Sequence, residues 1–131
     1  MRFYNHLVRF NQIRQLSTIN NNIYGSELIY NKIAQYTDTV FIYSGGAIMG
    51  LIDWFHPSKN IHDVKYYINT HEQNSGHSAT GFAKSSDKTG VVITTSGPGL
   101  TNMITPILDA LNDSVPLVII SGQVSREHMN T

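Results

Sequence analysis

A single glutamate stands at the start of a polar segment rich in small residues. Glu72 opens the run EQNSGHSATGFA and lies between His71 and Gln73. A carboxyl group in such a place can exchange a proton with a bound ligand or hold it by a hydrogen bond. It can equally be structural, because Thr70 and Gln73 fit a capping box. A carboxylate in the first turn also stabilises a helix by roughly 0.3–1 kcal/mol. The local sequence leaves both interpretations open.

Other junctions combine glycine with polar residues, and none of them matches a common catalytic motif. They are SGG at 44–46, TSGPG at 95–99 and SGQ at 121–123. The TSGPG segment lacks the third glycine of a dinucleotide fingerprint, and Ser96 lacks the two flanking glycines of a nucleophile elbow. His71 and His77 are six residues apart, so they cannot share one helix face as the histidines of zinc proteases do. These patterns argue against a hydrolase or a phosphate-binding loop.

The elements that would position these residues alternate between strands and helices. We expect strands at 39–46, 64–70, 90–97 and 115–122, the last two without polar alternation, as in strands buried on both faces. We expect helices at 25–34, 47–55, 72–86 and 100–111. Ser26 is a candidate N-cap for the first helix. Pro106 predicts a kink in the last helix or a later start.

This alternation predicts an α/β fold, a parallel sheet with helices on both faces. In such sheets ligands bind at the carboxyl ends of the strands. The junctions at 44–46, 69–73, 95–99 and 121–123 all follow expected strands. They should therefore meet at one edge, which is the candidate site.

Composition limits the class of protein. The chain has 131 residues, of which 40% are hydrophobic and 14% charged, as in one compact globular domain. No cysteine is present, which excludes disulfides and thiolate chemistry. The formal net charge is zero, so we expect no nucleic-acid partner. No apolar run reaches the roughly 20 residues of a membrane span, so we expect no membrane partner.

The first 22 residues differ from the rest and form a leader, with the folded domain expected over 23–131. Before Glu27 the chain has three arginines and no acidic residue, and Phe3, Leu7 and Phe10 recur at helical spacing. These features are typical of an organelle transit peptide, with RQLST at 14–18 as a candidate cleavage site. A flexible, Asn-rich extension is the alternative. We expect a mitochondrial or other organellar location, and otherwise a cytoplasmic one.

Taken together in order, the motifs resemble those of thiamine-diphosphate enzymes of the acetolactate synthase (acetohydroxyacid synthase) family. The similar segments are YSGGAIMGLIDWF at 43–55 and the run from HEQNSGH to ISGQV at 71–124. The resemblance covers about residues 25–126. It is to the N-terminal, pyrimidine-binding domain of the large catalytic subunit, here incomplete at its C-terminal end.

The resemblance implies a role for each matching residue. Glu72 matches the catalytic glutamate, which in that family hydrogen-bonds N1′ of the cofactor's aminopyrimidine ring. Further cofactor-binding positions are implied at Gly45, Gly46, Ala47, Pro98, Asn102 and Gln123. No metal ligand is implied within this chain. Two departures stand out, because Ser44 replaces a usual proline and Pro106 a usual glycine.

The resemblance also implies the function of the whole enzyme. It would use thiamine diphosphate to decarboxylate pyruvate and join the product to a second 2-keto acid, in branched-chain amino-acid biosynthesis. Mg²⁺ and FAD are implied as further cofactors, bound mainly by domains not included here, and no Gly-Asp-Gly diphosphate motif occurs in this sequence. The implied partners are a second copy of the chain, in a homodimer or higher assembly through the cofactor site, and a regulatory small subunit. We therefore expect this chain alone to be inactive. The alternatives are another thiamine-diphosphate-dependent 2-keto acid decarboxylase or oxidase, and a truncated, non-catalytic binding module.

Overall fold

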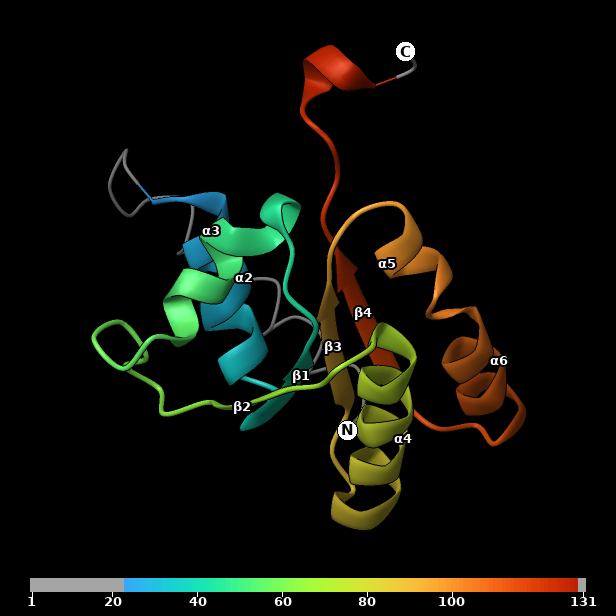
Figure 1. The fold of residues 1–131 in the computed structure, drawn as a ribbon. Helices are drawn as coiled ribbons and strands as arrows, with labels where there is room; N and C mark the ends of the chain where they lie inside the picture. The colour runs from blue at the N-terminus through green and yellow to red at the C-terminus, as the bar shows by residue number, and fades with distance from the viewer. Residues whose placement is uncertain (1–22, 130–131) are drawn as a thin grey trace, which may run out of the picture.

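A parallel sheet forms the centre of the molecule (Figure 1). The computed structural model describes residues 23–129. Its strands are β1 (Thr39–Ile42), β2 (Lys65–Ile68), β3 (Gly90–Thr94) and β4 (Leu117–Ser121). Their order in the sheet is β2-β1-β3-β4, and each neighbouring pair is parallel. The α/β fold with a parallel sheet is confirmed. The strands are shorter than expected, and in β1 and β3 the glycine-containing ends of the expected ranges form loops.

Helices cover both faces of this sheet. One face carries α2 (Gly25–Ala34), α3 (Met49–Ile52) and the flanking 3₁₀ turns η1 (Gly46–Ile48) and η2 (Asp53–Phe55). The other carries α4 (Glu72–Ser86), α5 (Pro98–Thr101) and α6 (Ile104–Asn112), and the turn η3 (Arg126–His128) follows β4.

Two hydrophobic clusters fill the spaces between the sheet and its helices. Val40 and Ile42 of β1 join the cluster under α2 and α3, whereas Phe41 joins the cluster under α4. Successive side chains of a strand point to opposite faces, so one strand supplies both cores. Tyr30 of α2 is fully buried in the first cluster, and its hydroxyl donates to Oδ1 of Asn60 at 2.6 Å. The central strands are thus held on both sides.

The segments expected as single helices at 47–55 and 100–111 are interrupted. The first is divided into η1, α3 and η2, and the second into α5 and α6 with a turn at 102–103. The later start that Pro106 suggests is confirmed, because α6 begins at Ile104. Pro106 then lies in the first turn, where its missing N–H has no partner to lose.

Both predicted helix caps are wrong. Tyr24 is the N-cap of α2 without a side-chain bond, and Ser26 instead accepts a hydrogen bond from the indole of Trp54 at 3.1 Å. His71, not Thr70, caps α4, because its Nδ1 accepts from the backbone N–H of Gln73. The leader at 1–22 lies outside the described residues. Over 23–129 we find no helix with the length and apolar character needed to cross a bilayer.

Candidate functional site

The predicted site residues follow the carboxyl ends of the strands, at one edge of the sheet. Gly45 and Gly46 follow β1, the segment at 95–99 follows β3, and Gly122 follows β4. Glu72 begins α4, shortly after the end of β2. Because all strands run in the same direction, these loops gather at the upper edge in Figure 1.

Glu72 has a buried carboxyl group with one oxygen already bonded. The residue is 5% exposed, and its Oε2 accepts a hydrogen bond from Nδ2 of Asn102 at 3.0 Å. No described residue donates a hydrogen bond to its Oε1. His71 performs the capping that sequence analysis assigned to this turn. Glu72 therefore retains an acceptor that a ligand can use.

Asn102 reaches Glu72 because two helices pack unusually closely. Asn102 lies in the turn between α5 and α6, and its backbone N–H donates to the carbonyl of Pro98 at 2.9 Å. At Gly76 of α4, an added Cβ would lie 2.4 Å from Cγ of Pro106 on α6. Any larger residue at Gly76 would force the helices apart. The close contact between Gly76 of α4 and Pro106 of α6 thus brings the side-chain amide of Asn102 to the carboxyl group of Glu72.

A second glycine allows close packing beside Glu72. Gly99 is buried, and an added Cβ would lie 2.8 Å from Oγ1 of Thr94 and 3.4 Å from Oε1 of Glu72. The turn before it depends on Gly97, whose φ of +61° and ψ of −118° strongly favour glycine. The TSGPG segment therefore uses its glycines for two different purposes, a turn and a close approach.

The loop after β1 contacts the loops after β3 and β4. An added Cβ at Gly45 would lie 2.4 Å from Cβ of Thr95, and one at Gly122 would lie 2.7 Å from Cβ of Ala47. Gly46 has no such neighbour within 4 Å and is exposed. Gly45 and Ala47 thus join the edge, whereas Gly46 borders open space.

Two predicted site residues are exposed and make no direct hydrogen bond to Glu72. Pro98 is the exposed first residue of α5. Gln123 is also exposed, and its Oε1 accepts from the backbone N–H of the neighbouring Val124 at 2.9 Å. Pro98 reaches Asn102 only through its backbone carbonyl, and neither residue makes a hydrogen bond to Glu72. Within the described part of the chain, no group of three or more His, Asp and Glu residues could hold a metal ion.

Sequence analysis missed Thr94 and Gly99 as parts of the site. The available signal was the TSGPG junction itself, which contains Gly99 and directly follows Thr94. Thr94 was counted as a residue of a buried strand, and nothing in its local sequence shows that its side chain lies beside Gly99.

Comparison with known proteins identifies the family of this chain. The family model described as the thiamine pyrophosphate enzyme, N-terminal TPP binding domain, matches residues 23–131. The mitochondrial acetolactate synthase catalytic subunit of Saccharomyces cerevisiae is 45% identical over 105 residues, which are 79% of this chain and 15% of that protein.

Bacterial relatives show the same level of similarity. The acetolactate synthase large subunit of Lactococcus lactis is 45% identical over 101 residues, 76% of this chain and 17% of that one. The isozyme 2 large subunit of Escherichia coli is 47% identical over 98 residues, 75% and 17% of the two chains. This chain therefore spans only 15–17% of the length of these three relatives.

A solved structure shares the fold. It is described as a thiamin diphosphate-dependent enzyme from Mycobacterium smegmatis and superposes with a TM-score of 0.65 at 24% identity. The superposition covers 78% of this chain and 19% of that one.

Proposed function

The chain belongs to the thiamine pyrophosphate enzyme family, and on this premise we propose that it forms the pyrimidine-binding half of an acetolactate synthase-type active site. One observation carries the proposal: the buried carboxyl group of Glu72 is bonded through one oxygen and open through the other. It lies at the sheet edge where ligands of parallel α/β folds bind.

The residues present fit thiamine diphosphate. Glu72 would hold N1′ of the aminopyrimidine through its carboxyl group. Gly99 leaves a position 3.4 Å from Oε1 of Glu72 without a side chain, and Gly45 allows close contact with Thr95. When bound, the cofactor supplies a nucleophilic carbon and an electron sink for the loss of carbon dioxide. The exposed positions of Pro98, Gln123 and Gly46 suit contact with the outer part of the ligand.

The chain's own part in the reaction is to control a proton. The carboxyl group of Glu72 holds or releases a proton at the N1′ position, and its burial strengthens that hydrogen bond by excluding water. Asn102 restricts the rotation of the carboxyl group through Oε2. The site thus presents one acceptor in a defined direction.

The reaction of the whole enzyme extends this proposal. By analogy with the named relatives, pyruvate is decarboxylated and the two-carbon product condenses with a second 2-keto acid. By the resemblance to the acetolactate synthase family, Mg²⁺ and FAD would be held mainly by domains outside residues 23–129. The relatives include proteins named mitochondrial, and the Arg-containing leader supports organellar import of this chain.

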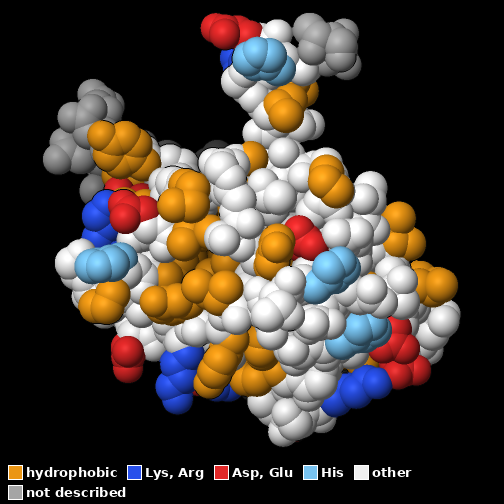
Figure 2. Space-filling view, in the orientation of Figure 1, with side chains coloured by type: hydrophobic (Ala, Val, Ile, Leu, Met, Phe, Trp, Pro, Cys, Tyr) orange, Lys and Arg blue, Asp and Glu red, His pale blue; other side chains and the backbone are white. Residues whose placement is uncertain are grey.

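A second copy of the chain is the proposed main partner, with a regulatory small subunit as a further one. The apolar stripe of α6 faces outward, so large aliphatic side chains are exposed on that helix: Ile104, Ile107, Leu108 and Leu111. Figure 2 shows hydrophobic side chains at the margin of the molecule where α6 lies. Exposed apolar stripes of this kind mark surfaces that associate.

The test replaces Glu72 by glutamine in a hybrid large subunit. Residues 23–129 take the place of the matching segment in the Lactococcus lactis protein, so that the remaining domains are supplied. Glutamine keeps the shape of the side chain but cannot supply the acidic proton. We expect turnover to fall by about 10²–10⁴-fold, with a parallel slowing of deuterium exchange at the cofactor's C2 carbon.

The matched control is Glu27→Gln, which changes another first-turn glutamate, on α2. It should leave turnover and exchange unchanged. A purely structural Glu72 would instead lose at most about 1 kcal/mol of stability in the glutamine variant and keep near-normal exchange. That result would reject the proposed role.

A further inference from the structure

The hydroxyl group of Thr94 is buried without a hydrogen bond. Thr94 ends β3 and is 0% exposed. Within residues 23–129, its Oγ1 is the one buried side-chain nitrogen or oxygen atom that lacks a partner. Leaving a buried hydroxyl unpaired is unfavourable, and valine would fill the same volume without that cost. Thr94 therefore needs an explanation other than packing.

A candidate partner for this hydroxyl is Oε1 of Glu72, which also lacks a hydrogen bond within the described chain. Oγ1 of Thr94 and Oε1 of Glu72 both lie within 3.4 Å of one point, the position that a Cβ on Gly99 would occupy. Neither atom has a partner among the described residues. Glycine at 99 lies in helical backbone, where alanine is normally the better residue. A methyl group there would lie 2.8 Å from Oγ1 of Thr94 and 3.4 Å from Oε1 of Glu72.

We propose that Thr94 is a positioning residue for Glu72, whose hydroxyl donates a hydrogen bond to Oε1 after a small rotation of the carboxyl group. The last torsion of a glutamate side chain has a broad minimum, so the rotation costs little. The inference rests on the proposed function of Glu72 and adds a second residue that controls it.

Two donors from different elements would then hold the carboxyl group. Asn102, in the turn after α5, binds Oε2, and Thr94, at the end of β3, binds Oε1. An ionised carboxylate offers about four acceptor sites, so each oxygen keeps one for the ligand. The plane of the carboxyl group is thereby set before any ligand binds, as a catalytic group requires.

The experiment compares variants of the full 131-residue chain by NMR, observing the side-chain amide of Asn102 in ¹⁵N-labelled protein. Thr94→Val removes the hydroxyl and keeps the shape. We expect the Asn102 amide signals to move and their solvent exchange to accelerate about fivefold, on the scale of one ordinary hydrogen bond. Thr94→Ser keeps the hydroxyl and should restore the wild-type signals.

The matched control is Thr80→Val, which changes another buried threonine. The hydroxyl of Thr80 donates to the carbonyl of Gly76 within α4, so its loss should leave the Asn102 amide unchanged. The proposal is overturned if Thr94→Val leaves that amide unmoved while the unfolding temperature rises, the result for a hydroxyl without any partner. This readout needs no cofactor. The Thr94 experiment and the Glu72→Gln experiment can therefore fail independently, which separates this inference from the proposed function.

Discussion

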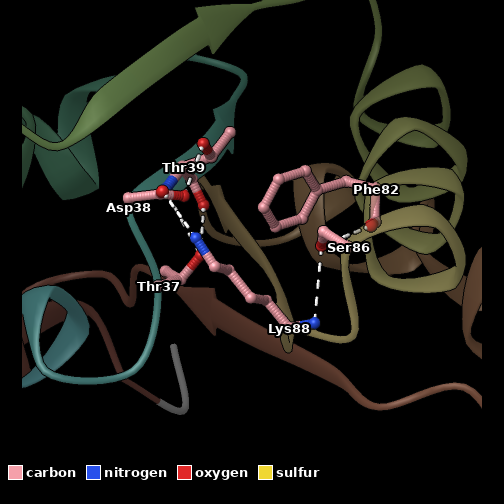
Figure 3. A network of polar contacts seen from close by, with 6 residues as sticks. All are labelled: Thr37, Asp38, Thr39, Phe82, Ser86 and Lys88. Carbon is pink, nitrogen blue, oxygen red and sulfur yellow. Dashed lines mark hydrogen bonds and ion pairs between the residues drawn. The ribbon is translucent and has the colours of Figure 1, made fainter.

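The edge where the strands begin and the edge where they end differ in how completely their polar side chains are hydrogen-bonded. At the edge where the strands begin, Nζ of Lys88 donates to Asp38 at 2.6 Å, and the hydroxyl of Thr39 donates to the same carboxylate (Figure 3). Ser86 likewise donates to the carbonyl of Phe82 and accepts from the backbone N–H of Lys88. At the edge where the strands end, Glu72 and Thr94 retain unpaired oxygens.

This difference suggests that the first edge stabilises the fold, whereas the second edge is suited to bind a ligand. At the first edge each of these polar side chains already has a partner within the chain, so a ligand has little to bind there. At the second edge, glycines bring backbone and side chains close and leave acceptors unfilled. Substitutions at the first edge should change stability alone, whereas those at the second should also change ligand binding.

The largest effect on stability is expected from adding a methyl group at the edge where the strands end. Gly45→Ala would place a methyl group 2.4 Å from Cβ of Thr95. Overpacking of this kind should lower the free energy of unfolding by about 1–3 kcal/mol. Urea denaturation of the chain measures the change.

The adjacent glycine is the matched control. Nothing lies within 4 Å of an added Cβ at Gly46, so Gly46→Ala should be neutral or slightly stabilising. Equal losses for the two variants would show that crowding against Thr95 is not the cause.

Thr37, at the edge where the strands begin, has a buried hydroxyl that is hydrogen-bonded, unlike that of Thr94. Thr37 is buried, and its Oγ1 donates to the carbonyl of Thr39 at 3.0 Å and accepts from the same residue's N–H at 3.2 Å. Thr37→Val removes both bonds and should cost about 1–2 kcal/mol of unfolding free energy. Thermal unfolding tests this, and Thr37→Ser should recover most of the loss.

In the hybrid large subunit, Thr37→Val should leave deuterium exchange at the cofactor's C2 carbon unchanged. A slower exchange would show that the first edge also serves the site, and the separation of the two edges would be wrong.

The smallest expected effect is the pH dependence of the ion pair at the first edge. The hydrogen bond from Lys88, helped by that from Thr39, lowers the pKa of Asp38 below its ordinary value of 3.8. A lowered pKa in the folded state means that the pair stabilises the fold above about pH 4 and that this contribution disappears as the pH falls through the lowered value.

Asp38→Asn should remove this contribution. Because both side chains are largely exposed, the loss at neutral pH should be a few tenths of a kcal/mol at most, roughly the worth of a surface ion pair. Unfolding curves at pH 7 and pH 3 measure the difference between the variant and the wild type. A difference that grows toward pH 3 would contradict the assignment.

The sequence was sufficient for the sheet because its signals are local. Apolar or aromatic runs predicted each strand, three of them ending in glycine, and the alternation with helices predicted parallel pairing, which the structure confirms. Glu72 was found because it stands at such a junction and because the surrounding motifs resemble a known family. Its pairing with Asn102 was not predicted, since it depends on the close packing of α4 and α6 at Gly76.

The caps and the buried hydroxyl could not be predicted for a related reason. Ser26 fits a cap by local sequence, but Trp54 lies close enough to donate to it. Thr94 resembles any β-branched strand residue until the fold places it beside Gly99. In each case a contact between distant parts of the chain overrides the local preference.

The packing of α4 against α6 connects assembly to the chemistry of the site. Asn102, which binds Glu72, lies just before α6, and the outer face of that helix carries the exposed aliphatic stripe. A partner that binds this stripe, as proposed above, would therefore contact the helix that directly follows the turn of Asn102, whose side-chain amide bonds Glu72. If the proposed assembly and the proposed cofactor site are both correct, subunit association and cofactor binding would be thermodynamically linked: whatever factor pairing adds to cofactor affinity, the cofactor would add to the affinity of the pair.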